Sequence, residues 1–274
     1  MKQKTISSLV VGVDFSEYSK LVAREAKQLA EKLQLSLVYV FSYEDGHLYK
    51  YYALPDRYAV MDQFQTKVRN YYNLDYSPKI VIRFGRADKE IIAVAKKERN
   101  PMIIVGHKSG HSIAKFFLGS VAESLASISP FPLWIHRGNK VKLPKKILIP
   151  SDLSERSEKT ISEVKNLKKT FHSDFEVYHV LQPPSPLLDY EIWSTLNNEI
   201  KDDDDQKIRA FKKKYPKLKT VRARGPVIDT INSRSKRFDL IAITPHSRAE
   251  SRNAFGGVSS KIVRSGETPV LIVP

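Results

Sequence analysis

Short runs of apolar and β-branched residues alternate along the chain with longer segments of helical spacing. In the first half such runs occur at 8–13, 35–41, 79–84, 102–106 and 132–136. In the second half they occur at 146–151, 175–181, 218–223, 240–244 and 269–273. Apolar runs of this length without strict alternation are typical of strands that are buried on both faces. The pattern therefore predicts parallel strands that are covered by helices.

Helical period is clearest between the first two of these strands. Residues 17–33 place apolar side chains at Leu21, Val22, Ala26, Leu29, Ala30 and Leu33. This spacing predicts an amphipathic helix over 17–33. Ser16 stands directly before it, where a helix N-cap belongs, and Ser154 takes the same place in the second half.

The two halves carry the same markers in the same order. The segment "GVDFSE" around Asp14 returns as "PSDLSE" around Asp152, and a helical pattern follows each. Near the other end, Pro132 in "SPFPLWIH" matches Pro269 in "GETPVLIVP". The polar segment "RGNKVKLPKK" between the halves is typical of a linker. The sequence thus predicts a duplicated domain, with copies at 1–138 and 145–274. Each copy is expected to be a small Rossmann-like, doubly wound α/β domain with a five-stranded parallel sheet flanked by helices.

Composition narrows the class of protein. The 274 residues are 41% hydrophobic and 10% aromatic, which is enough to fill sizeable cores. Cysteine is absent, and this excludes disulfides, zinc–thiolate sites and cysteine nucleophiles. No stretch approaches the roughly 20 apolar residues of a membrane span, and the N-terminal apolar run, which Asp14 interrupts, is shorter than expected for the core of a signal peptide. We expect a cytoplasmic protein.

The formal net charge of +16 is the one unusual bulk property. The basic residues are spread over both halves in pieces such as "KKER" and "FKKKYPK". A nucleic-acid surface usually concentrates its charge on one element, so solvated basic faces are favoured over nucleic-acid binding. The charge would still attract acidic ligands.

The candidate site lies beyond the carboxyl ends of the strands, where doubly wound sheets bind their ligands. Asp14 follows the first strand, and a glycine-containing loop at 106–120 follows the fourth. A glycine loop that runs into a helix N-terminus offers free backbone N–H groups to a phosphate. Glycine near such a turn also serves chain reversal, so the loop alone leaves both interpretations open.

In combination these features resemble the universal stress protein family in its tandem-domain form. The resemblance rests on "GVDFSE" and "PSDLSE", on the second strands in "VYVFSY" and "YHVLQP", and on the glycine loop before the last helix of each half. It implies an ATP site, with Mg²⁺ accompanying the nucleotide. Asp14 and Val40 would lie at the adenine and ribose. The residues implied at the phosphates are Gly106, Ser109, Gly110, Gly119 and Ser120.

The sequence departs from the family pattern differently in the two halves. The first keeps Gly106 and Gly119 but has Ser109 in place of the middle glycine, with Gly110 one position later. The second half reads "ITPHSRAESRNAFGGVSS", where threonine and proline replace the start of the loop. The first and middle glycines are thus lost from the second loop, and proline also removes a backbone donor. We therefore expect nucleotide binding in the first domain only.

Several residues have plainer interpretations. Asp14 could simply cap the helix through the turn at Ser16. His107 and His111 have no evident third ligand, so no metal site is predicted. The run "KDDDDQK", 201–207, is expected to be a solvated helix face. The aromatic segment "HLYKYYALPDRY", 47–58, is expected to pack rather than to stack on bases.

No catalytic motif appears, and nothing matches a nucleophile elbow or a Walker loop. We expect a nucleotide-binding stress-response or signalling module rather than an enzyme, with slow ATP hydrolysis left open. The alternative is a degenerate tandem protein that does not bind ATP and acts through protein partners or another small ligand. A third hypothesis is an ATP-using enzyme or nucleic-acid binder on a related fold. The resemblance also implies an internal pseudo-dimer through 132–135 and 269–273, and a further homodimer stays open.

Overall fold

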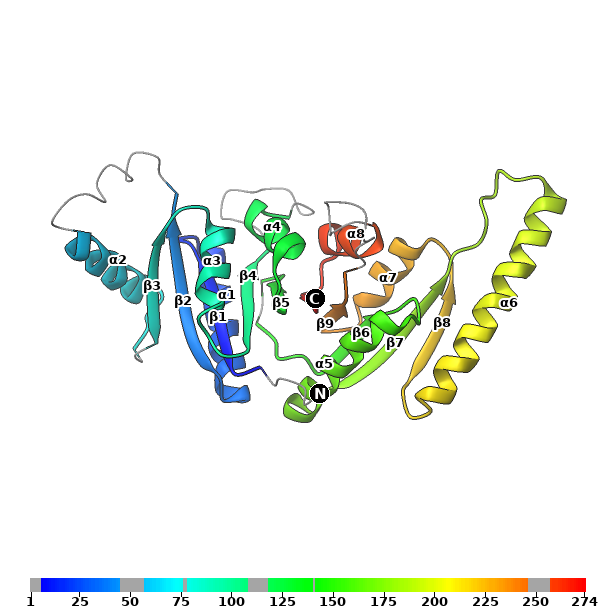
Figure 1. Ribbon diagram of the computed structural model, residues 1–274, viewed down its shortest axis with the longest axis horizontal. Coiled ribbons are helices and arrows are strands. Elements are labelled where there is room, and N and C mark those ends of the chain that lie inside the picture. The colour runs from blue at the N-terminus through cyan, green and yellow to red at the C-terminus, as the bar shows by residue number, and fades with distance from the viewer. Residues whose placement is uncertain (1–5, 45–56, 76–77, 108–117, 140, 246–256) are drawn as a thin grey trace. The chain divides into compact units, whose positions relative to one another are not determined.

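The computed structural model describes six stretches of the chain. These are residues 6–44, 57–75, 78–107, 118–139, 141–245 and 257–274. The chain divides into two compact units. Unit 1 comprises residues 1–143 with 269–272 and 274, and unit 2 comprises residues 144–268 with 273. All the strands predicted from the apolar runs are present (Figure 1).

Unit 1 is built on a parallel sheet. Its strands are β1 (Ser8–Val13), β2 (Ser36–Tyr43), β3 (Lys79–Phe84), β4 (Pro101–Gly106) and β5 (Leu133–His136). Their order is β3-β2-β1-β4-β5, and each neighbouring pair is parallel. Strand β10 (Val270–Ile272) pairs with β5 in the antiparallel sense. The strand order reverses between β1 and β4, which confirms the doubly wound fold and marks where ligands bind in such sheets.

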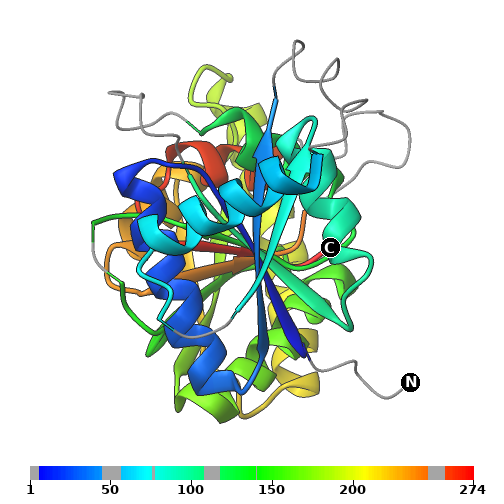
Figure 2. The ribbon, with the colours of Figure 1, turned by 90° about the vertical axis from the view of Figure 1, so that its left-hand side faces the viewer.

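Helices cover both faces of this sheet. They are α1 (Glu17–Leu33), α2 (Arg57–Tyr71), α3 (Ala87–Ala95) and α4 (Ser120–Ile128). Right-handed crossovers place α1 and α2 on one face and α3 and α4 on the other. Figure 2 shows α1 and α3 on opposite sides of the strands.

Helix α1 confirms the prediction from periodicity. The Ser16 side chain accepts a hydrogen bond from the Ser19 N–H at 3.1 Å, as an N-cap does. The helix ends at Gln34, whose φ of 54° turns the chain out of the helical path. Between these ends, Val22 and Ala26 belong to the buried stripe that packs on the sheet.

Unit 2 repeats the plan with four of the five strands expected for its half, because β10, the last strand of the second half, is grouped with unit 1. Its strands are β6 (Lys146–Pro150), β7 (Asp174–Leu181), β8 (Thr220–Arg224) and β9 (Leu240–Ile243), in the parallel order β9-β6-β7-β8. Its helices are α5 (Glu155–Phe171), α6 (Tyr190–Lys214), α7 (Val227–Ser235) and α8 (Gly257–Ser265). Strand register makes the units comparable residue by residue. Val40 lies opposite Gly12 in unit 1, and Tyr178 lies opposite Pro150 in unit 2. Tyr178 therefore takes the place of Val40.

The acidic run on α6 departs from its prediction. Asp202 and Asp203 are exposed, but Asp204 is only 4% exposed. Asp204 falls seven residues from Asn197 and seven from Phe211, and these three are the buried residues of α6. That spacing brings them to one face of the helix, so the prediction of a solvated face is wrong for Asp204.

The aromatic segment at 47–58 was expected to pack. Residues 47–56 lie outside the described residues, and Tyr58 in the first turn of α2 is 78% exposed. The prediction is therefore wrong for Tyr58, because its ring projects into solvent. Among the helices that the structure describes, none has the length and apolar character that a bilayer crossing requires.

Candidate functional site

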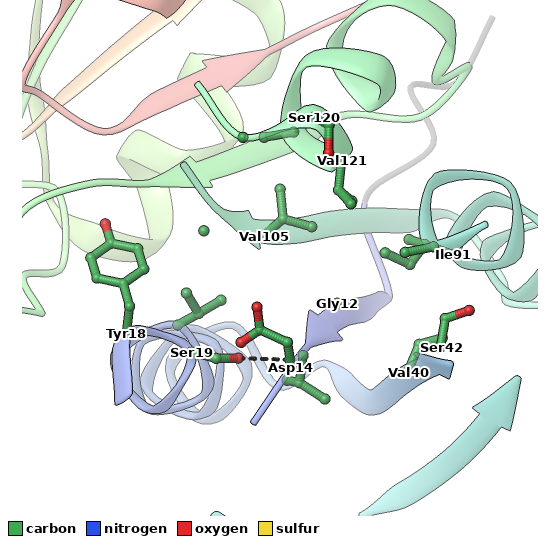
Figure 3. Close-up of a pocket in the computed structure, with 16 residues that line it drawn as sticks. Gly12, Asp14, Tyr18, Ser19, Val40, Ser42, Ile91, Val105, Ser120 and Val121 are labelled. Atoms are coloured by element: carbon green, nitrogen blue, oxygen red, sulfur yellow. Dashed lines mark hydrogen bonds between the residues drawn. The ribbon is translucent and has the colours of Figure 1, made fainter. Parts of the chain in front are cut away.

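Unit 1 has a cavity of about 130 Å³ at the carboxyl edge of its sheet. It lies at the point where the strand order reverses. Five of the residues singled out in the sequence line it, from β2, β4, the loop after β1 and the start of α4 (Figure 3). They are Asp14, Val40, Gly106, Gly119 and Ser120. The fold thus gathers positions that are far apart in the sequence. Ser109 and Gly110 lie outside the described residues.

Asp14 stabilises the turn that enters α1. One of its carboxylate oxygens, Oδ1, accepts hydrogen bonds from the Ser16 N–H at 3.1 Å and from the Ser16 hydroxyl. Its own N–H donates to Ser19 Oγ at 3.2 Å, the bond drawn in Figure 3. Asp14 thus holds the turn at Ser16, and it is Ser16 that acts as the N-cap of α1. Asp14 also remains exposed and lines the cavity, so this role does not prevent it from meeting a ligand.

Tyr18 of α1 closes the side of the cavity next to Gly106. A Cβ at Gly106 would lie 3.0 Å from the Tyr18 ring and 3.2 Å from Val22, so any larger residue here would require one of these side chains to shift. The Tyr18 hydroxyl lies 2.6 Å from His107 Nδ1 and donates to the His136 carbonyl at 3.2 Å. Burial raises the pKa of Tyr18 above its usual value, so the phenol stays protonated.

Both ends of the glycine loop meet at His107. The Gly119 N–H donates to the His107 carbonyl at 2.6 Å, which closes the loop at its base. Gly119 then acts as the N-cap position of α4 with a φ of −63°, a conformation that any residue can adopt. Ser120 begins the helix at the cavity wall. This arrangement aims a helix N-terminus, with its partial positive charge, at the cavity.

The cavity is nearly uncharged. Among its lining residues Asp14 is the one with an ionisable acid or base, apart from the phenol of Tyr18. No lysine or arginine of the described residues lines it. Among the described residues, backbone N–H groups and the α4 dipole are what this wall offers to a phosphate chain. No group of three potential metal ligands occurs in the described residues, and His111 lies outside them.

The sequence analysis did not identify the tyrosines that hold the turn at residues 14–16, which leads into α1. Tyr72 follows α2, and its hydroxyl donates to the Asp14 carbonyl and lies 3.0 Å from Ser19 Oγ. Tyr71 donates to the Phe15 carbonyl at 2.9 Å. Burial raises the pKa of Tyr72. These contacts join elements more than fifty positions apart in sequence, so only their position on the inner side of a predicted helix could have suggested them.

Unit 2 has a cavity of about 280 Å³ at the same edge. Thr244 stands where unit 1 has Gly106, and its hydroxyl pairs with that of Thr160, which takes the place of Val22. The Ser259 hydroxyl donates to the Thr244 carbonyl at 3.2 Å. The space that glycine leaves in unit 1 is thus filled and hydrogen-bonded here.

Asp152 repeats the turn of Asp14 with one addition. Its Oδ1 accepts from the Ser154 N–H at 3.1 Å and from the Ser154 hydroxyl at 2.7 Å. It also accepts from the Ser157 hydroxyl at 2.8 Å. Ser154 occupies the N-cap position as predicted, although its side chain caps no N–H of α5. At the other wall, Gly257 opens α8 with a φ of 70°, where unit 1 has Ser120.

Comparison with known proteins gives one consistent result. A model of the universal stress protein family matches residues 5–137 and, a second time, residues 144–274. A Pseudomonas aeruginosa protein of unknown function superposes with a TM-score of 0.72 at 16% identity, covering 98% of this chain and 93% of its own. A putative universal stress protein from the same species gives 0.72 at 17%, covering 98% and 94%.

A universal stress protein from Archaeoglobus fulgidus is similar over 97% of both chains, with a TM-score of 0.67 and 17% identity. At such identities the likeness to the solved structures shows the fold. No curated protein gives a significant match.

Proposed function

The chain belongs to the universal stress protein family, whose domain it carries twice, and from this premise we propose that its first domain binds ATP. The domains are proposed to span 1–138 and 145–274. The observation that carries the proposal is the convergence of Asp14, Val40, Gly106, Gly119 and Ser120 on a single cavity at the switch point of unit 1. Ligands of doubly wound folds bind at that place.

The proposed roles follow from position. Asp14 and Val40 contact the adenosine part, because Asp14 directly follows β1, Val40 lies in β2 beside it, and both line the cavity. Gly106, Gly119 and Ser120, with Ser109 and Gly110 of the loop between them, hold the phosphates. The N-terminus of α4, which opens at the cavity with Ser120, adds a partial positive charge that complements the phosphates. Mg²⁺ enters with the nucleotide, bound by its phosphates and water, with the Ser120 hydroxyl as the one protein ligand proposed.

The second domain is proposed not to bind ATP. Thr244 fills the place of Gly106 with a side chain that Thr160 holds by a hydrogen bond. Pro245 follows it and offers no backbone N–H. A phosphate chain would lose both the close backbone approach and one donor there.

The protein as a whole is proposed to be a cytoplasmic stress-response or signalling module that binds adenine nucleotide without an established catalytic step. The pairing of β5 with β10, strands that come from different repeats of the sequence, supports an internal pseudo-dimer. Two such chains are free to associate further as a homodimer.

A second candidate function is a module that binds no ATP and uses another small ligand. The observation that favours it is the difference in volume, about 130 Å³ in unit 1 against about 280 Å³ in unit 2. Sites for drug-sized ligands usually enclose about 300–1,000 Å³. On this measure unit 2 is the roomier site.

Calorimetric titration with Mg-ATP tests the proposal. Wild type should bind one nucleotide per chain, and Gly119→Val should lose most of the affinity. The φ of Gly119 accommodates valine, so the substitution blocks the approach of phosphate rather than the fold. Gly256→Val, just before α8, is the matched control and should bind as wild type does.

No heat and no competition at millimolar ATP, where the binding free energy is only about −4 kcal/mol, would favour the second candidate. Loss of binding in Gly256→Val alone would place the nucleotide in the other domain.

A further inference from the structure

Helix α6 rests on unit 2 through a polar stripe. Of its three buried residues, Asn197 and Asp204 are polar and only Phe211 is apolar. Helices that cover a sheet usually bury an apolar stripe. Here the stripe meets two arginines of β8, because Arg224 donates to Asn197 and Arg222 pairs with Asp204. Figure 1 shows α6 along β8.

His179 of β7 joins this stripe to the cavity. It is 8% exposed, and its two ring nitrogens contact different elements. Nε2 lies 2.5 Å from Asp204 Oδ1 on α6. Nδ1 lies 2.8 Å from the carbonyl oxygen of Ser151, which follows β6. His179, Ser151 and the next residue, Asp152, all line the cavity of unit 2.

These contacts fix the protonation of the imidazole. A backbone carbonyl only accepts hydrogen bonds, so Nδ1 must carry a hydrogen. An ionised carboxylate also only accepts, so Nε2 must carry one too. The Asp204 carboxylate also faces a cation, because Arg222 Nε lies 2.8 Å from its Oδ2, and Arg222 pairs with Asp205 as well. His179 is therefore an imidazolium when both contacts are made.

We propose that His179 is a proton-controlled link between helix α6 and the cavity of the second domain. A neutral imidazole has one N–H, so loss of the proton leaves either Asp204 or the Ser151 carbonyl without its donor. A buried acceptor that loses its partner is costly. The central turn of α6 then loosens from the sheet, or the turn at Ser151 and Asp152 moves at the cavity wall.

The direction of the pH effect follows from proton counting. The charged groups around the imidazole are Asp204 and Asp205 of α6 and Arg222 of β8, with Asp152 on the cavity side. The docked form requires the proton, and histidine changes charge between about pH 5 and 8. Docking therefore weakens as pH rises through this range.

Unit 1 provides an internal reference. Phe41 lies opposite Ile82 in the β2–β3 register, and His179 lies opposite Arg222 in the β7–β8 register. The place of His179 is thus held by Phe41, which does not titrate. The inference stands apart from the proposed ATP site, because no residue of unit 1 takes part in the link.

Hydrogen–deuterium exchange on the full chain at pH 5.5 and pH 8.0, corrected for intrinsic rates, tests the link. Amides of α6 around Asp204 should lose about tenfold in protection at the higher pH, the scale expected for one charged hydrogen bond. Amides of α1 should change little.

Two matched pairs of variants sharpen the test. His179→Gln and Asp204→Asn should each remove the pH dependence of α6. His172→Gln is the control for the first, because Gln34 already ends α1 at the corresponding place. Asp203→Asn is the control for the second, because Asp203 is exposed and pairs with Lys207 one turn further along α6. Both controls should keep the pH dependence of wild type.

Nitrogen-15 NMR of wild type keeps the proposal testable if a variant fails to fold. It should show both ring nitrogens of His179 protonated at pH 5.5. A neutral imidazole at that pH would overturn the proposal. Equal α6 protection at both pH values in wild type, or an unchanged pH dependence in His179→Gln, would overturn it as well.

Discussion

The layer between the sheet and its second helix differs completely between the two units. In unit 1 this layer is aromatic, since the Phe64 ring of α2 lies 5.6 Å from that of Phe41 and 6.4 Å from that of Phe84. In unit 2 the corresponding layer is ionic, with Asp204 of α6 between His179 and Arg222. The same topology therefore accepts either chemistry at this place.

The difference teaches that the second repeat is a repacked domain rather than a decayed copy. Apolar burial does not depend on protonation and is not screened by salt, whereas a charge layer responds to both pH and ionic strength. The loop side shows the same principle. Gly106 and Val22 of unit 1 become Thr244 and Thr160 in unit 2, and the two hydroxyls satisfy each other. A threonine hydroxyl buried alone at either position would be unfavourable, and here each hydroxyl has the other as its hydrogen-bond partner.

The largest effect is expected from removing the centre of the ionic layer. Asp204→Leu leaves the buried His179 and the partly exposed Arg222 without their shared counter-charge. Breaking a buried charge pair from one side typically costs about 3–5 kcal/mol, and we expect about 3 because Arg222 reaches solvent. Urea unfolding monitored on unit 2 measures the loss. Asp203→Leu on the same helix should cost little, and an equal loss in both variants would contradict the ionic account.

A smaller effect is expected in the aromatic layer. Phe64→Ala removes the ring that contacts Phe41, Tyr43 and Phe84. Because Phe64 is only partly buried, we expect about 2 kcal/mol, below the roughly 3–5 kcal/mol of a fully buried phenylalanine. Unfolding at 0.05 and 1 M NaCl should give the same loss. The proposed difference between the two layers would be contradicted if the stability loss in Phe64→Ala depended strongly on salt, or if that in Asp204→Leu did not depend on salt at all.

The smallest effect concerns a charge that unit 1 keeps and unit 2 lacks. Asp88 in the first turn of α3 accepts hydrogen bonds from Ser124 at 2.5 Å and from Arg86 at 2.8 Å. Burial would raise the pKa of Asp88, but these bonds outweigh it and hold the pKa below its usual value. Ile228 takes this place on α7, since Gly85 and Gly225 precede the two helices at matching positions.

Because the folded pKa is lowered, Asp88 contributes stability above its unfolded pKa of about 3.9, and this stability is lost as pH falls below that value. Asp88→Asn should lower the free energy of unfolding of unit 1 by about 1 kcal/mol at pH 7. In the variant this free energy should fall less steeply than in wild type as pH drops toward 3. Unfolding curves between pH 3 and 7 measure this. If the variant loses stability at low pH as steeply as wild type does, Asp88 is not the source of that pH dependence.

The strands and the first helix could be predicted from sequence because their signals are local. Continuous apolar runs mark buried parallel strands, and the period of 17–33 with Ser16 before it marks α1. The site positions could be named because they follow strands at one edge of the sheet. Gly106 and Gly119 thus meet at the cavity as the pattern indicates.

The burial of Asp204, the contact of Tyr72 and the role of Thr244 could not be predicted, because each depends on a partner residue that is distant in the sequence. Asp204 belongs to a run of four aspartates, and only its contact with His179 distinguishes it from its neighbours. Tyr72 reaches the Asp14 turn through a fold that brings α2 next to α1. The exchange of Gly106 for Thr244 looks like a loss in the sequence alone, because its compensation at Thr160 lies far away along the chain.

The central claim is that the first of two similar domains binds ATP and the second does not. Native mass spectrometry of the intact chain with excess Mg-ATP counts the bound nucleotides directly. The account predicts one nucleotide per chain in wild type, one in Gly256→Val and none in Gly119→Val. Two nucleotides per chain, none in wild type, or one retained in Gly119→Val would contradict it.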